Sequence, residues 1–474
     1  MSTMALRLKQ CSIDGPESLA LRLRRASSID GNPPLVLSHS GSVAAAQPDG
    51  KPLPAACLQS EALQAVRIVA WCRRTPEVAA VLGDRIKAHA ISGGLTNCAY
   101  IVEGSKGKLF VKQAEAFHKV ATAIPLSLAR LATEAMGIKL GHTYVPEAVP
   151  GLVHYDPAAS ILVAEFKEGL EMMSSALLRG AVYPGLGARL GSAMARLAFG
   201  ASPEVMGRRA FAALEAAVEE SASVADVMTD HTLILPFDRA APHNSWPAEL
   251  GPEVEAGIYG DAALMAEVAV LRALRASPGA RCFLHTDAWV NNILVPEWAE
   301  GTPAGEELAL VDFEFGTVGP NSYDIGHTIG TLLLAAITVR GYADAGAGGG
   351  AEGAVPRQRR AEQEEWLVAS AAEAWAAFCG AWAAQAKRRM PWQRRPAAPP
   401  LADAVGYAGI VVVRWSIGQF NIFRNLGLED GTPAYTAAVR AAVRVGGALI
   451  RRRHEIGSAD EIAAIARAEM ARAA

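Results

Sequence analysis

The chain lacks several features that would assign it to a class at once. Its six cysteines are scattered and none forms a CxxC pair, so the sequence predicts no disulfide framework or zinc site and indicates a reducing compartment. No apolar run is long enough to span a membrane; the best candidate, residues 329–339, indicates a buried helix. Lysine and arginine total 45 against 48 acidic residues, which argues against nucleic acid or a membrane as a partner.

At 474 residues the chain is long for a single domain. Residues 1–56 are rich in arginine and serine and poor in acids, which is typical of a disordered extension or of an organelle transit segment. We expect an N-lobe at 57–166 and a C-lobe at 167–474, with flexible insertions near 343–360 and 391–400 where glycine, alanine or proline dominate. The expected location is cytoplasmic, with organelle targeting as the alternative.

Two short segments beyond the middle of the chain carry acids at the ends of apolar runs. Asp287 is followed five residues later by Asn292, and Asp312 is followed two residues later by Glu314. Because side chains alternate along a strand, we expect Asp312 and Glu314 on the same side of an extended segment. This order suits phosphoryl transfer, in which one aspartate orients the acceptor hydroxyl while an asparagine and carboxylates hold Mg²⁺. Solvated acids at two strand ends are the alternative, but the order and spacing of the pair favour a kinase-type site.

A glycine turn and a lysine precede these segments. Ser92, Gly93 and Gly94 separate two apolar runs, and backbone N–H groups of such a turn can approach phosphates. A third short strand ends at Lys112, which we expect to reach the nucleotide phosphates with Glu134 of a following helix as its partner. A plain hairpin and a surface lysine are the alternatives.

Another apolar run, residues 159–166, carries Glu165 near its end. In a two-lobed kinase such a strand leads to the segment that binds adenine, so Glu165 is a candidate for nucleotide binding, with a structural role as the alternative. The chain is strand-rich before Phe166 and mostly helical after it. The expected fold is therefore α+β and protein-kinase-like, with a small β-rich N-lobe, a larger helical C-lobe and the site between them.

These motifs resemble those of the aminoglycoside phosphotransferase and choline kinase superfamily, which has a protein-kinase-like fold. The resemblance is carried by residues 92–97, Lys112, residues 285–287, Asn292 and residues 312–314. Within the superfamily the chain is most similar to the methylthioribose kinases. That similarity covers roughly residues 58–457 and is carried by residues 233–237, 244–246, 267–271, 312–315, 319–320, 324–326, 329–335 and 409–418.

The resemblance implies an ATP-dependent small-molecule kinase that phosphorylates the 1-hydroxyl of 5-methylthioribose in methionine salvage. It implies ATP and Mg²⁺ as cofactors and a small-molecule substrate, and it is compatible with a homodimer. Asp287 would orient the hydroxyl, and Asp312, Glu314 and Asn292 would bind Mg²⁺. The positions that would face the acceptor are Asn244, Trp246, Arg414 and Trp415.

Four positions depart from the family pattern. Thr286 replaces a glycine and removes flexibility from the turn before Asp287. Trp415 replaces the second arginine of a pair and cannot form a charged fork. Ser245 replaces an arginine between Asn244 and Trp246, and Asn292 stands where serine is usual.

These departures leave two other functions open. The first is a choline- or ethanolamine-type kinase, whose cationic substrate could contact Trp289 and Trp415. The second is a nucleotide-binding pseudokinase.

Overall fold

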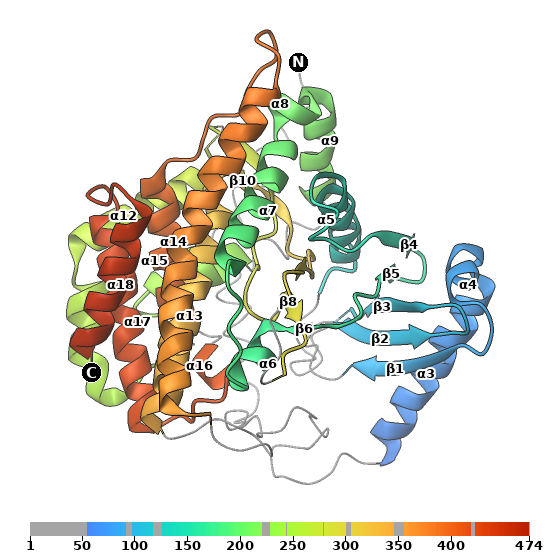
Figure 1. Ribbon diagram of the computed structural model, residues 1–474, viewed down its shortest axis with the longest axis horizontal. Coiled ribbons are helices and arrows are strands. Elements are labelled where there is room, and N and C mark those ends of the chain that lie inside the picture. The colour runs from blue at the N-terminus through green and yellow to red at the C-terminus, as the bar shows by residue number, and fades with distance from the viewer. Residues whose placement is uncertain are drawn as a thin grey trace, which may run out of the picture.

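The computed structural model describes residues 55–91, 97–116, 126–219, 228–242, 244–277, 279–299, 305–345, 355–418 and 422–473. Nearly all of the expected N-terminal extension lies outside these residues, as do Ser92, Gly93 and Gly94 of the expected glycine turn. The described chain consists of a five-stranded sheet with two helices beside it and a larger, mainly helical part (Figure 1). The predicted α+β class is therefore confirmed.

Five antiparallel strands form the main sheet in the order β1-β2-β3-β5-β4. Their bounds are β1 (Lys87–Ile91), β2 (Asn97–Glu103), β3 (Lys108–Ala114), β4 (Leu152–Asp156) and β5 (Ile161–Glu165). Helices α3 (Ala55–Arg74) and α4 (Pro76–Leu82) pack against it. Helix α5 (Arg130–Tyr144) separates β3 from β4 along the chain.

The two faces of this sheet belong to different cores because side chains alternate along a strand. Val111 and Val163 are buried in a small core with residues of α3 and α4. Leu162 and Ala114 belong to the main core, together with apolar residues of α5. Lys112 is opposite Leu162 in the sheet and lies two residues before Ala114, so the strand directs it toward α5.

Helices dominate the rest of the chain. The longer ones are α7 (Leu186–Gly200), α9 (Arg208–Glu219), α12 (Ala262–Arg275), α13 (Tyr323–Ala345), α14 (Arg357–Arg388), α15 (Leu401–Ile417), α17 (Pro433–Arg452) and α18 (Ala459–Ala473). Short helices and helical turns are α6 (Met173–Leu178), α8 (Pro203–Met206), η1 (Asp230–Ile234), η2 (Leu235–Phe237), η3 (Ala248–Leu250), α11 (Gly251–Val254), η4 (Glu255–Tyr259) and α16 (Ile422–Asn425). The chain is therefore mostly helical after Phe166, as expected.

Helices α13 and α15 pack closely through glycine. A Cβ atom at Gly326 would lie 2.5 Å from the carbonyl oxygen of Ala404, and one at Gly330 would lie 2.7 Å from that of Ala408. Any larger side chain would separate the two helices. This contact matters for function because α13 carries Asp324 in its first turn and α15 carries Arg414 in its last.

Helix α14 is long and apolar enough to cross a membrane by length and composition, and half of its most apolar window is buried in the protein. Trp375, Phe378 and Trp382 are buried on it, and Trp382 meets Phe199 of α7 edge-on with ring centroids 5.2 Å apart. These rings belong to the main core. Of the expected insertions, residues 346–354 lie outside the described residues, whereas 391–400 contain neither helix nor strand.

Two small sheets frame the loops that carry the motif acids. β7 (Arg281–Leu284) pairs with β10 (Thr317–Pro320), so Leu284 is opposite Thr317. β8 (Ile293–Pro296) pairs with β9 (Ala309–Leu310) and with β6 (Leu170–Met172), so Ile293 is opposite Leu310. The 285–292 loop and the 311–316 loop are therefore held side by side, because the strands at both of their ends are paired.

One structural expectation about the second loop is wrong. Asp312 and Glu314 were expected to share one side of an extended segment, but β9 ends at Leu310 and Asp312 has a φ of 69°. A residue in this left-handed region ends a strand and turns the chain. The two acids approach each other through this turn rather than through strand alternation.

Candidate active site

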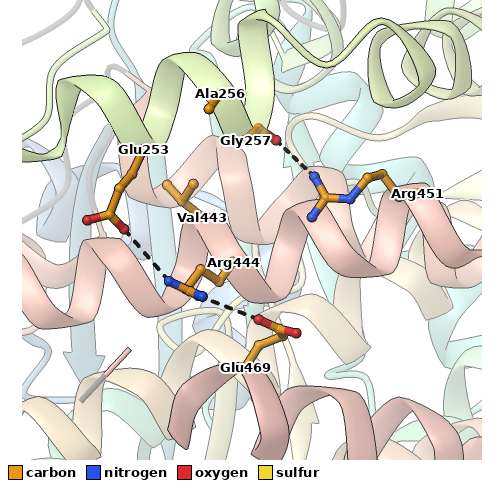
Figure 2. Close-up of a pocket in the computed structure, with 7 residues that line it drawn as sticks. All are labelled: Glu253, Ala256, Gly257, Val443, Arg444, Arg451 and Glu469. Atoms are coloured by element: carbon orange, nitrogen blue, oxygen red, sulfur yellow. Dashed lines mark hydrogen bonds and ion pairs between the residues drawn. The ribbon is translucent and has the colours of Figure 1, made fainter. Parts of the chain in front are cut away.

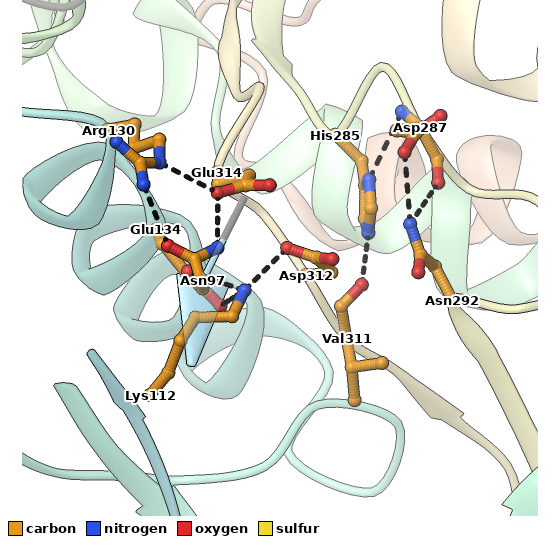
Figure 3. A network of polar contacts seen from close by, with 10 residues as sticks. All are labelled: Asn97, Lys112, Arg130, Glu134, His285, Asp287, Asn292, Val311, Asp312 and Glu314. Atoms are coloured by element: carbon orange, nitrogen blue, oxygen red, sulfur yellow. Dashed lines mark hydrogen bonds and ion pairs between the residues drawn. The ribbon is translucent and has the colours of Figure 1, made fainter. Parts of the chain in front are cut away.

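Lys112 lies at the centre of the first group of contacts (Figure 3). Its Nζ donates to both carboxylate oxygens of Glu134 at 2.9 Å and to Oδ1 of Asp312 at 2.7 Å. Burial alone would lower the pKa of Lys112, but the carboxylates of Asp312, Glu134 and Glu314 outweigh burial and raise it. Lys112 is therefore a charged, oriented lysine, and Glu134 is the helix acid expected beside it.

Glu314 is held by a second cation. Nε of Arg130 lies 3.2 Å from Oε2 of Glu314, and Nδ2 of Asn97 donates to the same oxygen at 2.7 Å (Figure 3). Nη2 of Arg130 also donates to Oδ1 of Asn97 at 3.0 Å. All three side chains are buried. Arg130 stands in no recognisable sequence motif, and the motif at residues 92–97 gives no sign of this side-chain role for Asn97.

Glu134, Asp312 and Glu314 form a carboxylate cluster. One oxygen of each lies within 4.8 Å of the others, and Mg²⁺ is bound in proteins by oxygen ligands of this kind. Glu134 was expected only as the partner of Lys112, yet its carboxylate belongs to the cluster. The donor set and its spacing fit a divalent cation.

Asp287 lies in a loop that several backbone contacts define. Asp324 at the start of α13 accepts from the backbone N–H of His285 at 2.6 Å and of Thr286 at 3.0 Å, so it braces the loop. Thr286 has a φ of 66°, and its hydroxyl donates to the carbonyl oxygen of Phe315 at 2.9 Å. The threonine that replaces the family glycine thus keeps the left-handed turn and links the two loops.

His285 supports Asp287 and is not placed as a base. Its Nε2 lies 3.0 Å from the carbonyl oxygen of Val311, and its Nδ1 lies 3.3 Å from the backbone nitrogen of Asp287 (Figure 3). Burial lowers the pKa of His285 to about 4. A neutral ring that donates from Nε2 and accepts at Nδ1 satisfies both contacts.

The carboxylate of Asp287 is buried and has an unusual pKa. Burial raises this pKa to about 7, while the charge of Arg414 opposes the shift. Nδ2 of Asn292 donates to Oδ2 of Asp287 at 3.1 Å and to its carbonyl oxygen at 2.9 Å. Asn292 therefore orients the carboxylate of Asp287 through its amide nitrogen, while the expected role of its amide oxygen as a metal ligand stays a prediction.

Arg414 and Trp415 are both buried, and the charge of Arg414 acts on Asp287. The guanidinium of Arg414 lies 4.1 Å from the centre of the Trp415 ring, and Trp289 stacks on Trp415 with centroids 5.1 Å apart. Nε and Nη1 of Arg414 have no hydrogen-bond partner among the described residues. Arg414 therefore offers donors next to Asp287, whereas the ring of Trp415 is already covered.

Asn244 and Trp246 flank Ser245, whose backbone contacts the end of α15, the helix that carries Arg414 and Trp415. The backbone N–H of Ser245 donates to the carbonyl oxygen of Ile417 at 2.9 Å, which places this segment at the end of α15. Nδ2 of Asn244 donates to the carbonyl oxygen of Leu235 at 2.7 Å, and Trp246 packs on Tyr259 with ring centroids 5.8 Å apart. Both side chains make structural contacts beside the predicted acceptor side.

Glu165 is separate from these contacts. Its carboxylate accepts from the backbone N–H of Gly151 at 2.9 Å and lies 3.5 Å from Nζ of Lys167. The alternative weighed from the sequence, a structural acid at the end of β5, describes these contacts. A role for Glu165 in nucleotide binding stays a prediction.

A surface pocket of about 350 Å³ lies between η4, α17 and α18, away from the motif acids (Figure 2). Its charged groups are paired with one another: Arg444 lies 3.9 Å from Glu253 and 3.5 Å from Glu469, and Arg451 donates to the carbonyl oxygen of Gly257 at 3.1 Å. These pairs use the polar groups that a ligand would need, so the two loops and the carboxylate cluster are the better candidate site.

Two solved structures that align with this chain are a choline kinase and a spectinomycin phosphotransferase. Choline kinase from Cryptosporidium parvum Iowa II is 12% identical, with a TM-score of 0.36 and coverage of 86% of this chain and 93% of that one. Spectinomycin phosphotransferase is 12% identical, with a TM-score of 0.34 and coverage of 79% and 97%.

Sequence relatives are more informative. Methylthioribose kinase from Cronobacter sakazakii is 27% identical over 392 residues, which cover 80% of this chain and 92% of that protein. Methylthioribose kinase from Geobacillus sp. is 26% identical over 397 residues, which cover 80% and 90%. Methylthioribose kinase 2 from Oryza sativa subsp. japonica is 27% identical over 325 residues, which cover 67% and 70%.

The family model that describes the phosphotransferase enzyme family matches residues 87–361. This range is more than half of the chain. It contains the five-stranded sheet, helix α5, both motif loops and the carboxylate cluster. The chain therefore belongs to the phosphotransferase enzyme family.

Proposed function

We propose that this protein is an ATP-dependent kinase that phosphorylates the 1-hydroxyl of 5-methylthioribose in methionine salvage. The observation that carries the kinase part is the placement of Asp287, a buried carboxylate between Asn292 and Arg414 and beside the carboxylate cluster. The acceptor is supported by the relatives, several of which are methylthioribose kinases that align over most of their length.

In the proposed reaction the acceptor hydroxyl oxygen attacks the γ-phosphorus of ATP, the bond from that phosphorus to the β,γ-bridging oxygen breaks, and ADP leaves. The hydroxyl proton passes to Oδ1 of Asp287, which has no hydrogen-bond partner among the described residues. Asn292 holds the other oxygen of Asp287 in place. A pKa of about 7 suits this step, because a base works best when its pKa is near the working pH.

Lys112 would contact the phosphates of ATP, and Glu134 keeps its ammonium group in place. Asp312 and Glu314 would hold Mg²⁺, with Glu134 near enough to join them. The metal would neutralise charge on the phosphates when bound. We assign Ser92, Gly93 and Gly94 to the phosphates and Glu165 to the nucleotide side on the resemblance alone.

The acceptor side favours a neutral, hydroxylated substrate over a cationic amino alcohol. A cation would lie near the guanidinium of Arg414, and Trp415 has no open ring for it because Trp289 and Arg414 already contact that ring. The donors of Arg414 that lack partners in the described residues suit sugar hydroxyls instead. Asn244 and Trp246 would shape the edge of this pocket.

The test is phosphoryl transfer from labelled ATP to 5-methylthioribose, choline and ethanolamine with purified protein and Mg²⁺. We expect labelled product with 5-methylthioribose only. Product with choline or ethanolamine alone would replace the acceptor but keep the kinase. Tight ATP binding with no transfer to any of the three would favour the pseudokinase.

Three finer predictions accompany this proposal. A small-molecule substrate follows from membership of the family, while a homodimer remains a prediction that sedimentation would test. A cytoplasmic location agrees with the bacterial relatives. Organelle targeting by residues 1–56 remains the alternative.

A further inference from the structure

We infer that Arg130 is a positioning residue for the phosphoryl-transfer reaction: with Asn97 it fixes Glu314 for the metal and fastens helix α5 to the 311–316 loop. This inference rests on the proposed function, because it takes Glu314 to be a metal ligand. Neither Arg130 nor Asn97 is expected to touch the nucleotide or the acceptor.

The guanidinium of Arg130 contacts backbone carbonyl oxygens as well as the side chains of Asn97 and Glu314. Nη1 donates to the carbonyl oxygen of Ser127 at 2.8 Å and Nη2 to that of Glu115 at 2.8 Å. Nη2 also reaches Asn97, and Nε faces Glu314. The planar group is therefore fixed by backbone on one side and presents its charge to Glu314 on the other. Arg130 is fully buried, so solvent does not weaken this pairing.

Asn97 completes a closed ring of three side chains. It accepts from Arg130 through Oδ1 and donates to Glu314 through Nδ2 (Figure 3). The hydrogen bond from Asn97 and the ion pair with Nε of Arg130 meet Glu314 at the same oxygen, Oε2. A hydrogen bond and an ion pair at one oxygen fix the direction of the carboxylate group, which is what a metal ligand requires of its supporting contacts.

Charge gives a second reason for Arg130. Three buried or half-buried acids lie within 4.8 Å of one another in the carboxylate cluster, and like charges at such distances repel. Lys112 pairs with Glu134 and Asp312, and Arg130 pairs with Glu314. Lys112 and Arg130 offset two of the three negative charges, which reduces the repulsion among the acids. One net negative charge remains, and it attracts a divalent cation.

Helix α5 links the two pairs. Arg130 and Glu134 are four residues apart on this helix and so share one face. That face meets Glu314 directly through Arg130 and meets Asp312 through the Lys112 bridge. A displacement of α5 would therefore disturb both acids together, and loss of Arg130 would free Glu314 while leaving the lysine pair intact.

The test measures binding of Mn²⁺ in the presence of ADP, by titration calorimetry and by electron paramagnetic resonance, so it does not depend on the acceptor. We expect Arg130→Lys and Asn97→Ala to weaken Mn²⁺ binding about 10–100-fold, the usual effect of removing a partner of a metal ligand. In steady-state assays the KM for the metal–ATP complex should rise, and the KM for the acceptor should stay constant.

Arg360 provides the matched control. It is another fully buried arginine, whose Nη1 and Nη2 donate to the carbonyl oxygens of Leu177 and Leu178 at 2.8 Å in the helical part. Arg360→Lys removes the same chemistry and should lower the melting temperature without changing Mn²⁺ affinity. Adding Arg130→Lys to Glu314→Gln should cause no further loss of Mn²⁺ affinity, because the two side chains act as one unit.

The outcomes separate the inference from the proposed function. If the wild-type protein binds Mn²⁺ with ADP but Arg130→Lys and Asn97→Ala bind it equally well, the positioning role is wrong and the kinase proposal survives. If Arg130→Lys does not fold, Asn97→Ala still decides, since it leaves the charges of Arg130 and Glu314 in place. If the wild-type protein binds no Mn²⁺ with ADP, both ideas fail together.

Discussion

The two sides of the candidate site use their polar groups in opposite ways. On the nucleotide side, Lys112 and Arg130 are paired with the acids of the carboxylate cluster before any ligand is present. On the acceptor side, buried polar atoms have no hydrogen-bond partner among the described residues; they are Oδ1 of Asp287, Nε and Nη1 of Arg414, Nε1 of Trp415 and Oδ1 of Asn244.

This difference indicates that the nucleotide side is suited to a charged ligand and the acceptor side to a polar one. Buried polar atoms without partners cost free energy that a ligand can recover by bonding to them. A hydroxylated acceptor would supply the missing partners, whereas ATP and a metal would enter a site whose charges are already arranged. The acceptor side should therefore decide substrate choice, and the nucleotide side should decide metal and phosphate binding.

The largest expected effect comes from Asp287→Asn. This change removes the proposed base but keeps the shape, so kcat should fall by about 10²–10⁴ while binding of Mn²⁺ with ADP stays unchanged. A coupled kinase assay and titration calorimetry measure the two quantities. Asp261→Asn, at the N-cap of α12 away from the site, is the control and should keep full activity. Loss of ADP binding in Asp287→Asn would instead assign Asp287 to the nucleotide side.

The nucleotide side was largely predictable from sequence, because its parts stand in short motifs. Lys112 lies on the expected strand and Glu134 on the helix that follows it. Arg130 was missed because its pairing with Glu314 joins residues far apart in the chain, and no local pattern signals such a contact.

The acceptor side was less predictable. The stacking of Trp289 on Trp415 and the position of Arg414 beside them depend on how the 285–292 loop meets helix α15. The left-handed backbone at Thr286 and Asp312 was also missed, since a β-branched residue such as threonine disfavours it and aspartate adopts it only in a minority of positions. Tertiary packing determines these features. In the sequence, the only sign of them was that some positions depart from the family pattern.

A smaller effect is expected for Arg414→Ala on the acceptor side. Loss of a charged hydrogen-bond donor typically costs about 1.5–3 kcal/mol, so the KM for 5-methylthioribose should rise about tenfold or more while the KM for ATP changes little. Arg360→Lys, already the control for Arg130, should leave both KM values unchanged. Equal rises in both would mean that Arg414 supports the fold of the whole site.

Arg414→Ala should also change the pH dependence of kcat/KM. Asp287 must be ionised to accept a proton, so kcat/KM of the wild-type enzyme should fall as the pH drops below about 7. The charge of Arg414 lowers the pKa of Asp287, and its removal should raise that pKa and move the acidic limb to higher pH. An unmoved limb in a pH–rate profile would show that another group controls it.

The smallest effect, at the junction of the two sides, concerns Thr286. Its left-handed backbone costs free energy for any residue with a Cβ, by about 1–2 kcal/mol, and its hydroxyl bond to Phe315 returns about 0.5–1.5 kcal/mol. Thr286→Gly loses the bond but also the backbone cost, so its melting temperature should stay close to that of the wild type. Thr286→Ala loses the bond and keeps the cost, and it should melt lower than Thr286→Gly. Thr286→Ser, which keeps the hydroxyl, should melt near the wild type.

If the bond also holds the 285–292 loop against the 311–316 loop, Thr286→Gly should lower kcat several-fold without a change in either KM. Thr286→Ser should have the kcat of the wild type. Equal kcat values in all three variants would show that Asp324 alone holds the loop.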